Sequence, residues 1–349
     1  MSKSKQSRTD LILDFVRSHP LSSSKDIHDG LLDGSSYATV KRILQSLISE
    51  NLISTTGKGK GTKYQVSQVY DLLSPIDVEQ YFQNEIDERK IKNIFNHFLI
   101  TETLSTVSIF TKEELDRLND LQKQYLDKSK RLSKPEYKKE LERLAIDLSW
   151  KSSQIEGNTY SLLETERLLK DKETAAGKTK DEAIMLLNHK AALDFIIANP
   201  DYIKPLSLSS IESIHSILIK ELEVERNIRS RIVGITGTNY KPLDNEFQIR
   251  EALNDMCYTV NQQKNVFSKA LLVLMLVSYI QPFSDGNKRT TRIISNAILI
   301  QNNYCPMSFR TVDSIEYKKA LLIFYEQNNI SSFKEIFIDQ FEFAVNTYF

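Results

Sequence analysis

Cysteine and histidine are scarce in this sequence of 349 residues, and their scarcity argues against two kinds of site. The two cysteines, Cys257 and Cys305, have no partner at the short spacing of metal ligands or redox motifs. The five histidines are scattered along the chain, so a histidine metal centre is not expected. Cysteine usage of this kind is typical of a cytoplasmic protein.

Long hydrophobic runs are also absent from the sequence. No apolar stretch reaches the roughly 18 residues that a membrane span needs, so a membrane partner is not expected. The first residues, Met-Ser-Lys-Ser-Lys-Gln-Ser-Arg, contain no apolar segment and do not resemble a secretory signal. The length and the hydrophobic fraction of 40% are instead those of a globular protein with two or three domains. Taken together, these features indicate a cytoplasmic protein.

The N-terminal 70 residues form a basic module, although the formal net charge of the chain is zero. This stretch holds ten lysines and arginines against six aspartates and glutamates. Apolar spacing predicts three short helices, and two strand-like runs, 52–56 and 62–66, flank the loop Gly57–Gly61. Three helices followed by such a hairpin resemble a winged helix-turn-helix, which we assign to residues 1–70.

A winged helix-turn-helix commonly binds DNA, and the resemblance implies which residues would do so here. The third helix would enter the major groove, and lysines of the wing would contact phosphates. Two other interpretations stay open, namely a wing whose lysines are merely solvated and a module that binds protein or a second copy. The candidate DNA-binding residues are Tyr37, Thr39, Lys41, Arg42, Lys58, Lys60 and Lys63.

The rest of the chain is predicted to be mainly helical. Residues 71–135 have helical patterns, such as Val78 to Phe82 and Ile91 to Phe98, and form a connecting region. Residues 136–349 contain long helices and few strand signals, so we expect one helical domain there. The clearest exception is 232–242, where glycines interrupt a short strand-like run and predict a small hairpin.

The most informative segment is the loop that follows the apolar stretch Ala270 to Ile280. This stretch has no charge, so we expect a helix buried on all sides. Pro282 ends that helix, and Gly286 permits a positive φ and a close approach of the backbone. A second helix then begins near Asn287. Its free N–H groups and the positive end of its dipole predict an anion site at the loop.

Residues 281–292, Gln-Pro-Phe-Ser-Asp-Gly-Asn-Lys-Arg-Thr-Thr-Arg, resemble the signature of the Fic family, HPFx(D/E)GN(G/K)RxxR. Fic proteins transfer AMP from ATP to a hydroxyl side chain of a protein, so the resemblance implies ATP and Mg²⁺ as cofactors. It implies that Asp285 holds the metal and that Gly286, Asn287 and Lys288 form the anion hole. It also implies that Arg289 and Arg292 contact the distal phosphates.

The sequence departs from this signature at two positions. The histidine that serves the family as general base is replaced by Gln281, whose carboxamide is essentially non-basic near neutral pH. We therefore expect nucleotide binding without efficient transfer, whether the glutamine is natural or introduced. Lys288 stands where many members have glycine, and a lysine is found in the Doc-like branch, which phosphorylates its targets by binding ATP in reverse.

A second motif lies upstream of the loop. Residues 141–157 predict an amphipathic helix that ends at Gly157 and places Glu156 in its last turn, where the helix dipole disfavours a carboxylate. Ser152, Glu156 and Gly157 match the pattern (S/T)xxxE(G/N) of Fic proteins that carry an inhibitory helix. The resemblance implies that Glu156 pairs with Arg292 and blocks the position of the γ-phosphate. A surface glutamate at a helix end is the simpler alternative.

The predicted hairpin at 232–242 occupies the place of the family's flap, which clamps an extended segment of the target by strand addition. The resemblance assigns Ile235, Thr236 and Gly237 to the flap edge and expects Tyr240 to stack nearby. A hairpin without a partner is the alternative.

We therefore expect a mainly α protein, in which a Fic-type helical bundle at 136–349 with a small β-hairpin flap follows a winged-helix module. Three functions fit this organisation. The first is an autoinhibited adenylyltransferase that acts on an unknown protein or on itself and that has lost its base, which leaves open whether the chain is an active enzyme. The second is a DNA-binding transcription regulator that senses nucleotide, and the third is a Doc-like protein kinase. A homodimer fits the family as well.

Overall fold

The computed structural model describes residues 7–31, 34–50 and 52–349 of the chain. The chain divides into two compact units, Met1–Ile76 and Asp77–Phe349. The region expected at 71–135 to connect two domains therefore belongs mostly to the larger unit. The sequence predicts no secretory signal at the N-terminus. Residues 1–6, on which most of that expectation rests, lie outside the described residues.

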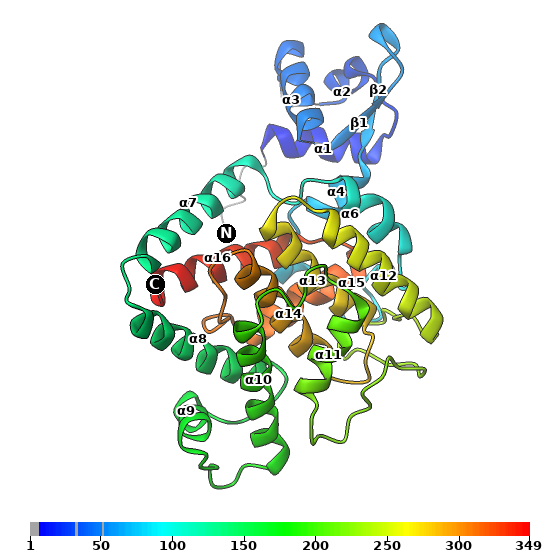
Figure 1. The fold of residues 1–349 in the computed structure, drawn as a ribbon. Helices are drawn as coiled ribbons and strands as arrows, with labels where there is room; N and C mark the ends of the chain where they lie inside the picture. The colour runs from blue at the N-terminus through cyan, green and yellow to red at the C-terminus, as the bar shows by residue number, and fades with distance from the viewer. Residues whose placement is uncertain (1–6, 32–33, 51) are drawn as a thin grey trace. The chain divides into compact units, whose positions relative to one another are not determined.

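In its described residues, the smaller unit contains three helices followed by a two-stranded antiparallel hairpin, as expected for a winged helix, and a short fourth helix after the hairpin (Figure 1). Ile53 pairs with Val66, and a loop with one turn of 3₁₀-helix joins the strands. Its core is formed by side chains from all three helices and the first strand, with Val16, Val40 and Leu47 fully buried. The elements are α1 (Arg8–Ser18), α2 (Ser24–Gly30), α3 (Tyr37–Ser49), β1 (Ile53–Thr56), η1 (Gly59–Gly61), β2 (Lys63–Val66) and α4 (Gln68–Leu73).

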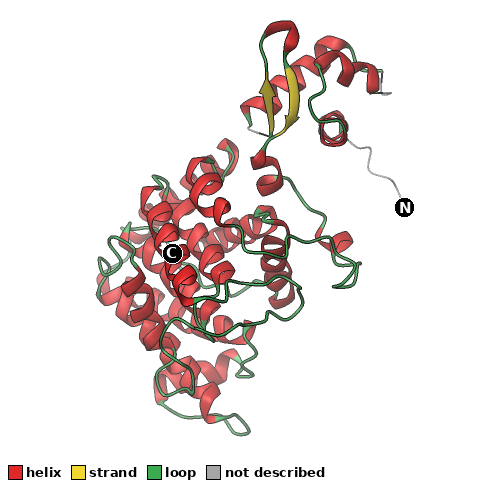
Figure 2. Ribbon diagram, turned by 90° about the vertical axis from the view of Figure 1, so that its right-hand side faces the viewer, coloured by secondary structure: helices red, strands yellow, loops and turns green. Residues whose placement is uncertain are grey.

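The larger unit is built of helices and loops, and the two strands drawn in Figure 2 belong to the smaller unit. The prediction of a mainly α fold is thus confirmed. Its elements are α5 (Val78–Tyr81), the π-helix η2 (Leu99–Thr103), α6 (Leu104–Thr106), α7 (Lys112–Ser129), α8 (Lys134–Ile155), α9 (Leu162–Asp171), α10 (Lys180–Ala198), α11 (Leu208–Leu218), α12 (Glu246–Gln262), α13 (Val266–Ile280), α14 (Asn287–Gln301), α15 (Ser314–Gln327) and α16 (Ser331–Thr347).

Helices α13 and α14 form the centre of the larger unit, with α8, α10, α11, α12, α15 and α16 around them (Figure 1). From Phe267 to Ile280, every side chain of α13 except that of Lys269 is buried. Burial on all faces removes the freedom of a helix to shift, because protein interiors are close-packed. The loop that joins α13 to α14 is therefore held between two fixed helix ends.

Two local expectations are wrong. Residues 91–96 are extended rather than helical, because their backbone groups bond to Glu326 and Lys241 instead of to each other. Residues 232–242 do not form a hairpin: they run extended through a turn at 236–237, with one isolated bridge from Lys241 to Ile94.

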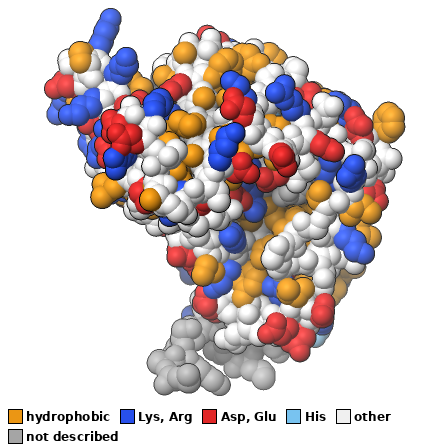
Figure 3. Space-filling view, turned by 90° about the horizontal axis from the view of Figure 1, so that it is seen from below, with side chains coloured by type: hydrophobic (Ala, Val, Ile, Leu, Met, Phe, Trp, Pro, Cys, Tyr) orange, Lys and Arg blue, Asp and Glu red, His pale blue; other side chains and the backbone are white. Residues whose placement is uncertain are grey.

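Acidic and basic side chains are interspersed over the surface seen in Figure 3, in agreement with the zero net charge. Among the described residues, no helix is both long and apolar enough to cross a membrane.

The core of the smaller unit yields a test of its architecture. Leu44 is 1% exposed, so Leu44→Ala should destabilise this unit by about 2–5 kcal/mol, the usual cost of such a cavity. Gln45→Ala changes an exposed neighbour on the same helix and should have little effect. Hydrogen exchange of the α1 and α3 amides in the full chain measures the difference, and equal protection in the two variants would contradict this core.

Candidate functional site

The loop between α13 and α14 begins with a left-handed residue. Gln281 has φ 51° and ends α13, while its N–H still bonds to the carbonyl oxygen of Val277. A non-glycine residue in this region is strained and needs support from its surroundings. Arg229 supplies that support, since its Nε donates to the carbonyl oxygen of Gln281 at 2.6 Å and its backbone N–H donates to Pro282 at 3.0 Å.

Side-chain amides fix the first half of the loop. Gln281 donates from Nε2 to the carbonyl oxygen of Ser278 at 2.6 Å and accepts from Asn287 Nδ2 at 3.0 Å. The Asn287 side chain also accepts from Phe283 N–H and donates to Phe283 O. Gln281 is 8% exposed and lies at the pocket edge, where it can accept or donate a hydrogen bond but cannot take a proton.

The second half of the loop rests on His215 and Phe283. The two rings stack at 3.6 Å, and His215 Nε2–H donates to the carbonyl oxygen of Asp285 at 3.0 Å. Burial lowers the pKa of His215 to about 4, so the ring is neutral at physiological pH. Gly286 has φ 81°, and a Cβ there would lie 3.3 Å from His215 Nε2. His215 is therefore buried directly beneath the loop.

Two buried guanidinium groups follow on α14, which begins at Asn287. Arg289 is 1% exposed and donates to the Asp285 carboxylate at 3.0 Å. Within the described part of the chain, its Nε and NH1 atoms have no hydrogen-bond partner. Arg292 is fully buried, donates from Nε to Ser152 Oγ at 2.8 Å, and approaches Glu156 Oε1 at 2.8 Å through NH2. The helix start therefore concentrates positive charge beside the loop.

Glu156 is the anion that the structure places against these cations. It is the C-cap of α8, and Gly157 follows with φ 102°, as the sequence predicted for the helix end. Its second oxygen lies 3.3 Å from Lys288 Nζ. Burial opposes ionisation of Glu156, but Arg292 and Lys288 outweigh that effect and lower the pKa of Glu156 below its ordinary value. The carboxylate is therefore charged at neutral pH.

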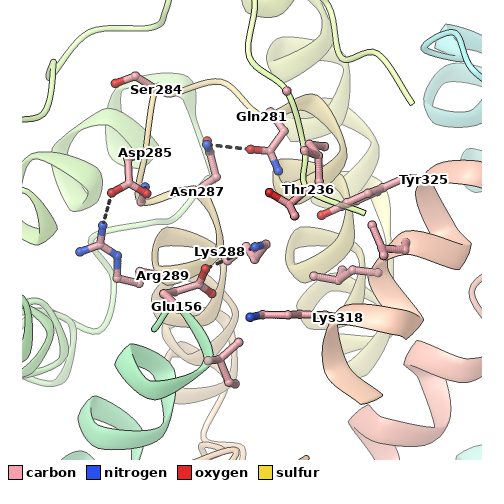
Figure 4. A pocket seen from close by; sticks show the side chains of 16 residues that line it. Glu156, Thr236, Gln281, Ser284, Asp285, Asn287, Lys288, Arg289, Lys318 and Tyr325 are labelled. Atoms are coloured by element: carbon pink, nitrogen blue, oxygen red, sulfur yellow. Dashed lines mark hydrogen bonds and ion pairs between the residues drawn. The ribbon is translucent and has the colours of Figure 1, made fainter. Parts of the chain in front are cut away.

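A pocket of about 470 Å³ opens above this charge cluster (Figure 4). Its polar side is formed by Glu156 and the loop residues Gln281 and 284–289. Its other side is formed by α15 and by residues 234–236 of the expected flap. The size and the mixed lining are those of a small-molecule site.

Four pocket residues of α15 were not predicted from the sequence, namely Lys318, Leu321, Leu322 and Tyr325. Figure 4 shows Lys318 extending from α15 toward Glu156, and Tyr325 lying beside Thr236 and Gln281. They lie 26 to 33 residues beyond the end of the loop signature at Arg292, and the sequence carries no motif that marks them. Only the packing of α15 against α13 brings them to the pocket.

The structure places only two of the four expected flap residues at the pocket. Ile235 and Thr236 line the pocket, whereas Gly237 and Tyr240 do not. Tyr240 is 2% exposed, and its hydroxyl donates to the carbonyl oxygen of Tyr279 at 3.0 Å. Tyr240 does stack on a neighbouring ring, that of Tyr279 of α13, so this side chain is part of the aromatic core and not of the pocket lining.

The expected DNA-binding residues lie on α3, on the loop between the strands of the smaller unit and, for Lys63, at the start of β2. Lys41, Arg42, Lys58 and Lys60 are exposed. The remaining three are already engaged within the unit: the Tyr37 hydroxyl bonds to Ser24, the Thr39 hydroxyl to Ser36, and Lys63 pairs with Asp26 at 3.5 Å.

One acidic side chain of the loop suits a metal. Asp285 is 63% exposed, and a carboxylate is the hard oxygen ligand that Mg²⁺ prefers, together with water and substrate phosphates. In the described ranges no cluster of three or more histidine, cysteine, aspartate or glutamate residues could hold a metal by itself. Asp285 therefore fits a metal that arrives with a phosphate ligand.

A helical body surrounds a loop that leads into the start of α14, and comparison with known proteins shows what this arrangement is similar to. Residues 205–299 match the Fic/DOC family, and residues 8–124 match the penicillinase repressor family, which covers the winged helix and continues into the larger unit. The centre of the larger unit is thus similar to Fic/DOC proteins, and a winged-helix module lies at its N-terminal side.

Named relatives agree with this assignment. The chain is 24% identical over 265 residues to protein adenylyltransferase Fic of Nematostella vectensis, an alignment that covers 69% of this chain and 60% of that protein. It is 24% identical over 174 residues to protein adenylyltransferase fic-1 of Caenorhabditis elegans, covering 48% of this chain and 34% of that protein. The chain thus spans about a third to 60% of the length of these relatives.

Solved structures show the same fold. C. elegans Fic-1 superimposes with a TM-score of 0.59 at 20% identity, covering 68% of this chain and 72% of that chain. A Fic domain containing signaling protein from Bacteroides thetaiotaomicron gives 0.57 at 20% identity, covering 66% of this chain and 94% of that chain.

The ion pair of Glu156 should make stability depend on pH. Because the folded pKa of Glu156 is lowered, its charge stabilises the fold above its ordinary pKa of 4.5, and that contribution disappears as the pH falls through the folded value. At pH 7, Glu156→Gln should cost about 1–3 kcal/mol, since hydrogen bonds to charged groups are lost beside buried Arg292.

Urea denaturation at pH 7 and at pH 3.5 measures this effect, and the difference between parent and variant should shrink at the lower pH. Glu166→Gln, which removes an exposed i,i+4 partner of Lys170, is the control and should change stability by less than about 0.5 kcal/mol. A difference for Glu156→Gln that does not depend on pH would contradict a charged pair.

Proposed function

We propose that the larger unit binds MgATP in the pocket above α14 and belongs to the protein adenylyltransferases, held inactive by Glu156 and slowed by Gln281. The observation that carries the proposal is the start of α14, where residues 286–289, with the buried Arg289, line a cavity of about 470 Å³, while the fully buried Arg292 pairs with Glu156 at its wall. A triphosphate is the anion that matches this concentration of donors.

The residues that line the pocket support one orientation of ATP, with its phosphates at the start of α14 and its base at α15. Phosphates would lie against Gly286 and Arg289, whose unpartnered Nε and NH1 atoms are donors that a phosphate oxygen can satisfy. The nucleobase would lie against the apolar side chains of Leu321, Leu322 and Tyr325. Asp285 would hold Mg²⁺, which supplies charge neutralisation at the phosphates when it is bound.

Glu156 opposes this binding mode. It occupies Arg292, the cation deepest in the site, and so takes the place that the terminal phosphate needs. Lys288 adds a second contact to the same carboxylate, so Glu156 is held by two cations instead of one. ATP must therefore displace a carboxylate that is both paired and hydrogen-bonded, and its apparent affinity falls by the cost of that displacement.

Gln281 sets the rate of transfer. A general base would take the proton from the attacking hydroxyl, and its loss commonly slows a reaction by about 10²–10⁴. The Gln281 amide can still orient the hydroxyl of a protein target or of this chain itself. The relatives from N. vectensis and C. elegans are named adenylyltransferases, which supports this choice of reaction over other nucleotide chemistry.

Lys288 favours an alternative reaction. A long cationic side chain in the anion hole would favour the reversed orientation of ATP that leads to phosphate transfer, as in the Doc-like branch. The contact between Lys288 Nζ and Glu156 Oε2 draws this side chain toward α8, which leaves the hole open in the inhibited state. We therefore rank AMP transfer first and phosphate transfer second.

Calorimetry with MgATP tests nucleotide binding. We expect Glu156→Gly to bind at least about tenfold more tightly than the parent, because the competing carboxylate is gone. Adding Arg289→Ala to Glu156→Gly should remove the heat, which ties the signal to this pocket. An absence of heat from the folded Glu156→Gly variant would contradict the proposed function.

Intact mass after incubation with MgATP tests the reaction. In the double variant Gln281→His with Glu156→Gly, we expect a mass increase equal to one or more AMP groups, at a rate about 10²–10⁴ above that of Glu156→Gly alone. Label from α-³²P ATP should then stay on the protein. Label from γ-³²P ATP would instead support the Doc-like kinase, and an unmodified double variant that binds ATP would count against transfer.

A second function rests on the smaller unit. We propose that this unit binds DNA. The chain would then be a transcription regulator that senses nucleotide through the pocket of the larger unit. The match of residues 8–124 to the penicillinase repressor family and the exposure of Lys41, Arg42, Lys58 and Lys60 support this function. The two functions are compatible, because they use different units.

Salt dependence separates DNA binding from a merely solvated wing. Lys58→Ala with Lys60→Ala should weaken binding of the full chain to its own promoter fragment and lower the slope of log K against log salt by about 0.9 for each lost phosphate contact. Lys123→Ala, an exposed lysine of α7, is the control and should change nothing. Equal affinity and slope in all variants would contradict a DNA-binding wing.

A further inference from the structure

Residues 77–96, which we call the strap, form the first segment of the larger unit and contact α15. They consist of the short helix α5, a series of turns and an extended stretch at 90–96. Three backbone contacts hold them there. Lys92 N–H donates to Glu326 O at 2.7 Å, Gln327 Nε2 donates to Lys90 O at 2.7 Å, and Lys92 Nζ donates to Gln327 O at 2.9 Å. The strap is therefore fixed to the C-terminal end of the helix whose other residues line the pocket.

A buried ion pair marks the centre of this contact. Arg89 and Glu326 have side chains that are 4% and 0% exposed, and their charged atoms lie 3.1 Å apart. The other oxygen of Glu326 accepts from the Tyr81 hydroxyl at 2.5 Å, and the ring of Phe82 lies 5.0 Å from the Arg89 guanidinium. Such buried pairs add little net stability, because desolvation offsets the attraction, but they fix the relative position of the segments that carry them.

Arg89 also reaches the flap. Its NH2 atom donates to the carbonyl oxygen of Gly237 at 2.5 Å. Gly237 directly follows Thr236, and Glu326 directly follows Tyr325, and these two predecessors lie beside each other in the pocket (Figure 4). One guanidinium therefore ties together two adjoining walls of the nucleotide pocket.

The flap itself has little support between its ends. In the part of the chain that the structure describes, the backbone groups of residues 233–236 make no hydrogen bond. Contacts resume at Gly237, and beyond it the strap holds Asn239 through Asp87 at 2.9 Å and Lys241 N–H through Asn93 O at 3.0 Å. The position of residues 233–236 thus depends on the contacts that anchor the chain from Gly237 onward.

We propose that Arg89 is a positioning residue that holds the flap, residues 233–236, with its free backbone edge available to an extended segment of the protein target. The part of this inference that concerns the target rests on the proposed function, whereas the anchoring of the flap does not. Arg89 acts through Gly237 and touches neither nucleotide nor target.

Hydrogen exchange of the full chain tests the anchoring. The amides that can report on the flap are the hydrogen-bonded ones at its C-terminal end, Tyr240 N–H and Lys241 N–H. In Arg89→Gln, we expect these two flap amides to exchange at least about tenfold faster, since the flap loses its anchor to α15. Amides of α13 should keep their protection, which shows that the fold is intact. Arg89→Lys is a second variant for the case that Arg89→Gln does not fold. It keeps the buried positive charge, but a lysine lacks the branched guanidinium that contacts both Glu326 and Gly237, so we expect the same faster exchange.

Arg117→Gln is the matched control, because Arg117 also pairs with a glutamate, Glu342, but is half exposed on α7. Flap exchange in this variant should equal that of the parent. Unchanged flap exchange in both Arg89 variants would overturn the proposal, as would a general loss of protection that includes α13 in both.

The role toward the target has a separate measurement. In the background of Gln281→His with Glu156→Gly, Arg89→Gln should lower the rate of self-modification at least about tenfold, while the affinity for MgATP measured by calorimetry stays within about twofold. An equal loss of ATP affinity would show that Arg89 only maintains the pocket, and would overturn its role toward the target. If that background does not bind MgATP, the proposed function fails, and the exchange measurement still decides whether Arg89 anchors the flap.

Discussion

A guanidinium that is removed from water needs an anion, and Arg292 is such a group. It is fully buried on α14, in the most tightly enclosed part of the larger unit. In the structure, its anion is Glu156, which comes from the end of α8. The arrangement that we propose for the active state replaces that carboxylate with a phosphate. Inhibition and binding are thus two ways to satisfy the same buried charge, and both depend on the fixed position of α14.

The loop between α13 and α14 forms the wall of the proposed triphosphate site next to that charge. Its shape is imposed from outside, by Arg229 on the carbonyl oxygen of Gln281 and by His215 under Gly286. Because these supports come from other elements, the loop keeps its shape without a ligand. That is the preorganisation which electrostatic stabilisation of a triphosphate requires. The replacement of the family histidine by Gln281 leaves this frame intact and removes only the group that would accept a proton.

The remaining walls of the pocket come from α15 and from the flap, and the strap connects the two through Arg89. Our two proposals thus give the larger unit two kinds of control over one site. In them, Glu156 acts on the phosphate end by charge, whereas Arg89 acts on the flap by position. The two controls share no residue, so each can change without the other.

The sequence by itself determined the helical character of the chain, the winged-helix module, the buried helix before the loop and the order of charged residues after it. These features depend on local periodicity and on the chemistry of glycine and proline, which neighbours in the chain decide. It also placed Glu156 at a helix end, while its contact with Arg292 rested on resemblance until the structure brought the two together. The tertiary structure alone decided that 232–242 has no hairpin, that Tyr240 is buried, and that Lys318, Tyr325 and Arg89 lie at the site. Those outcomes depend on side-chain and backbone partners more than 35 residues away, which no local pattern records.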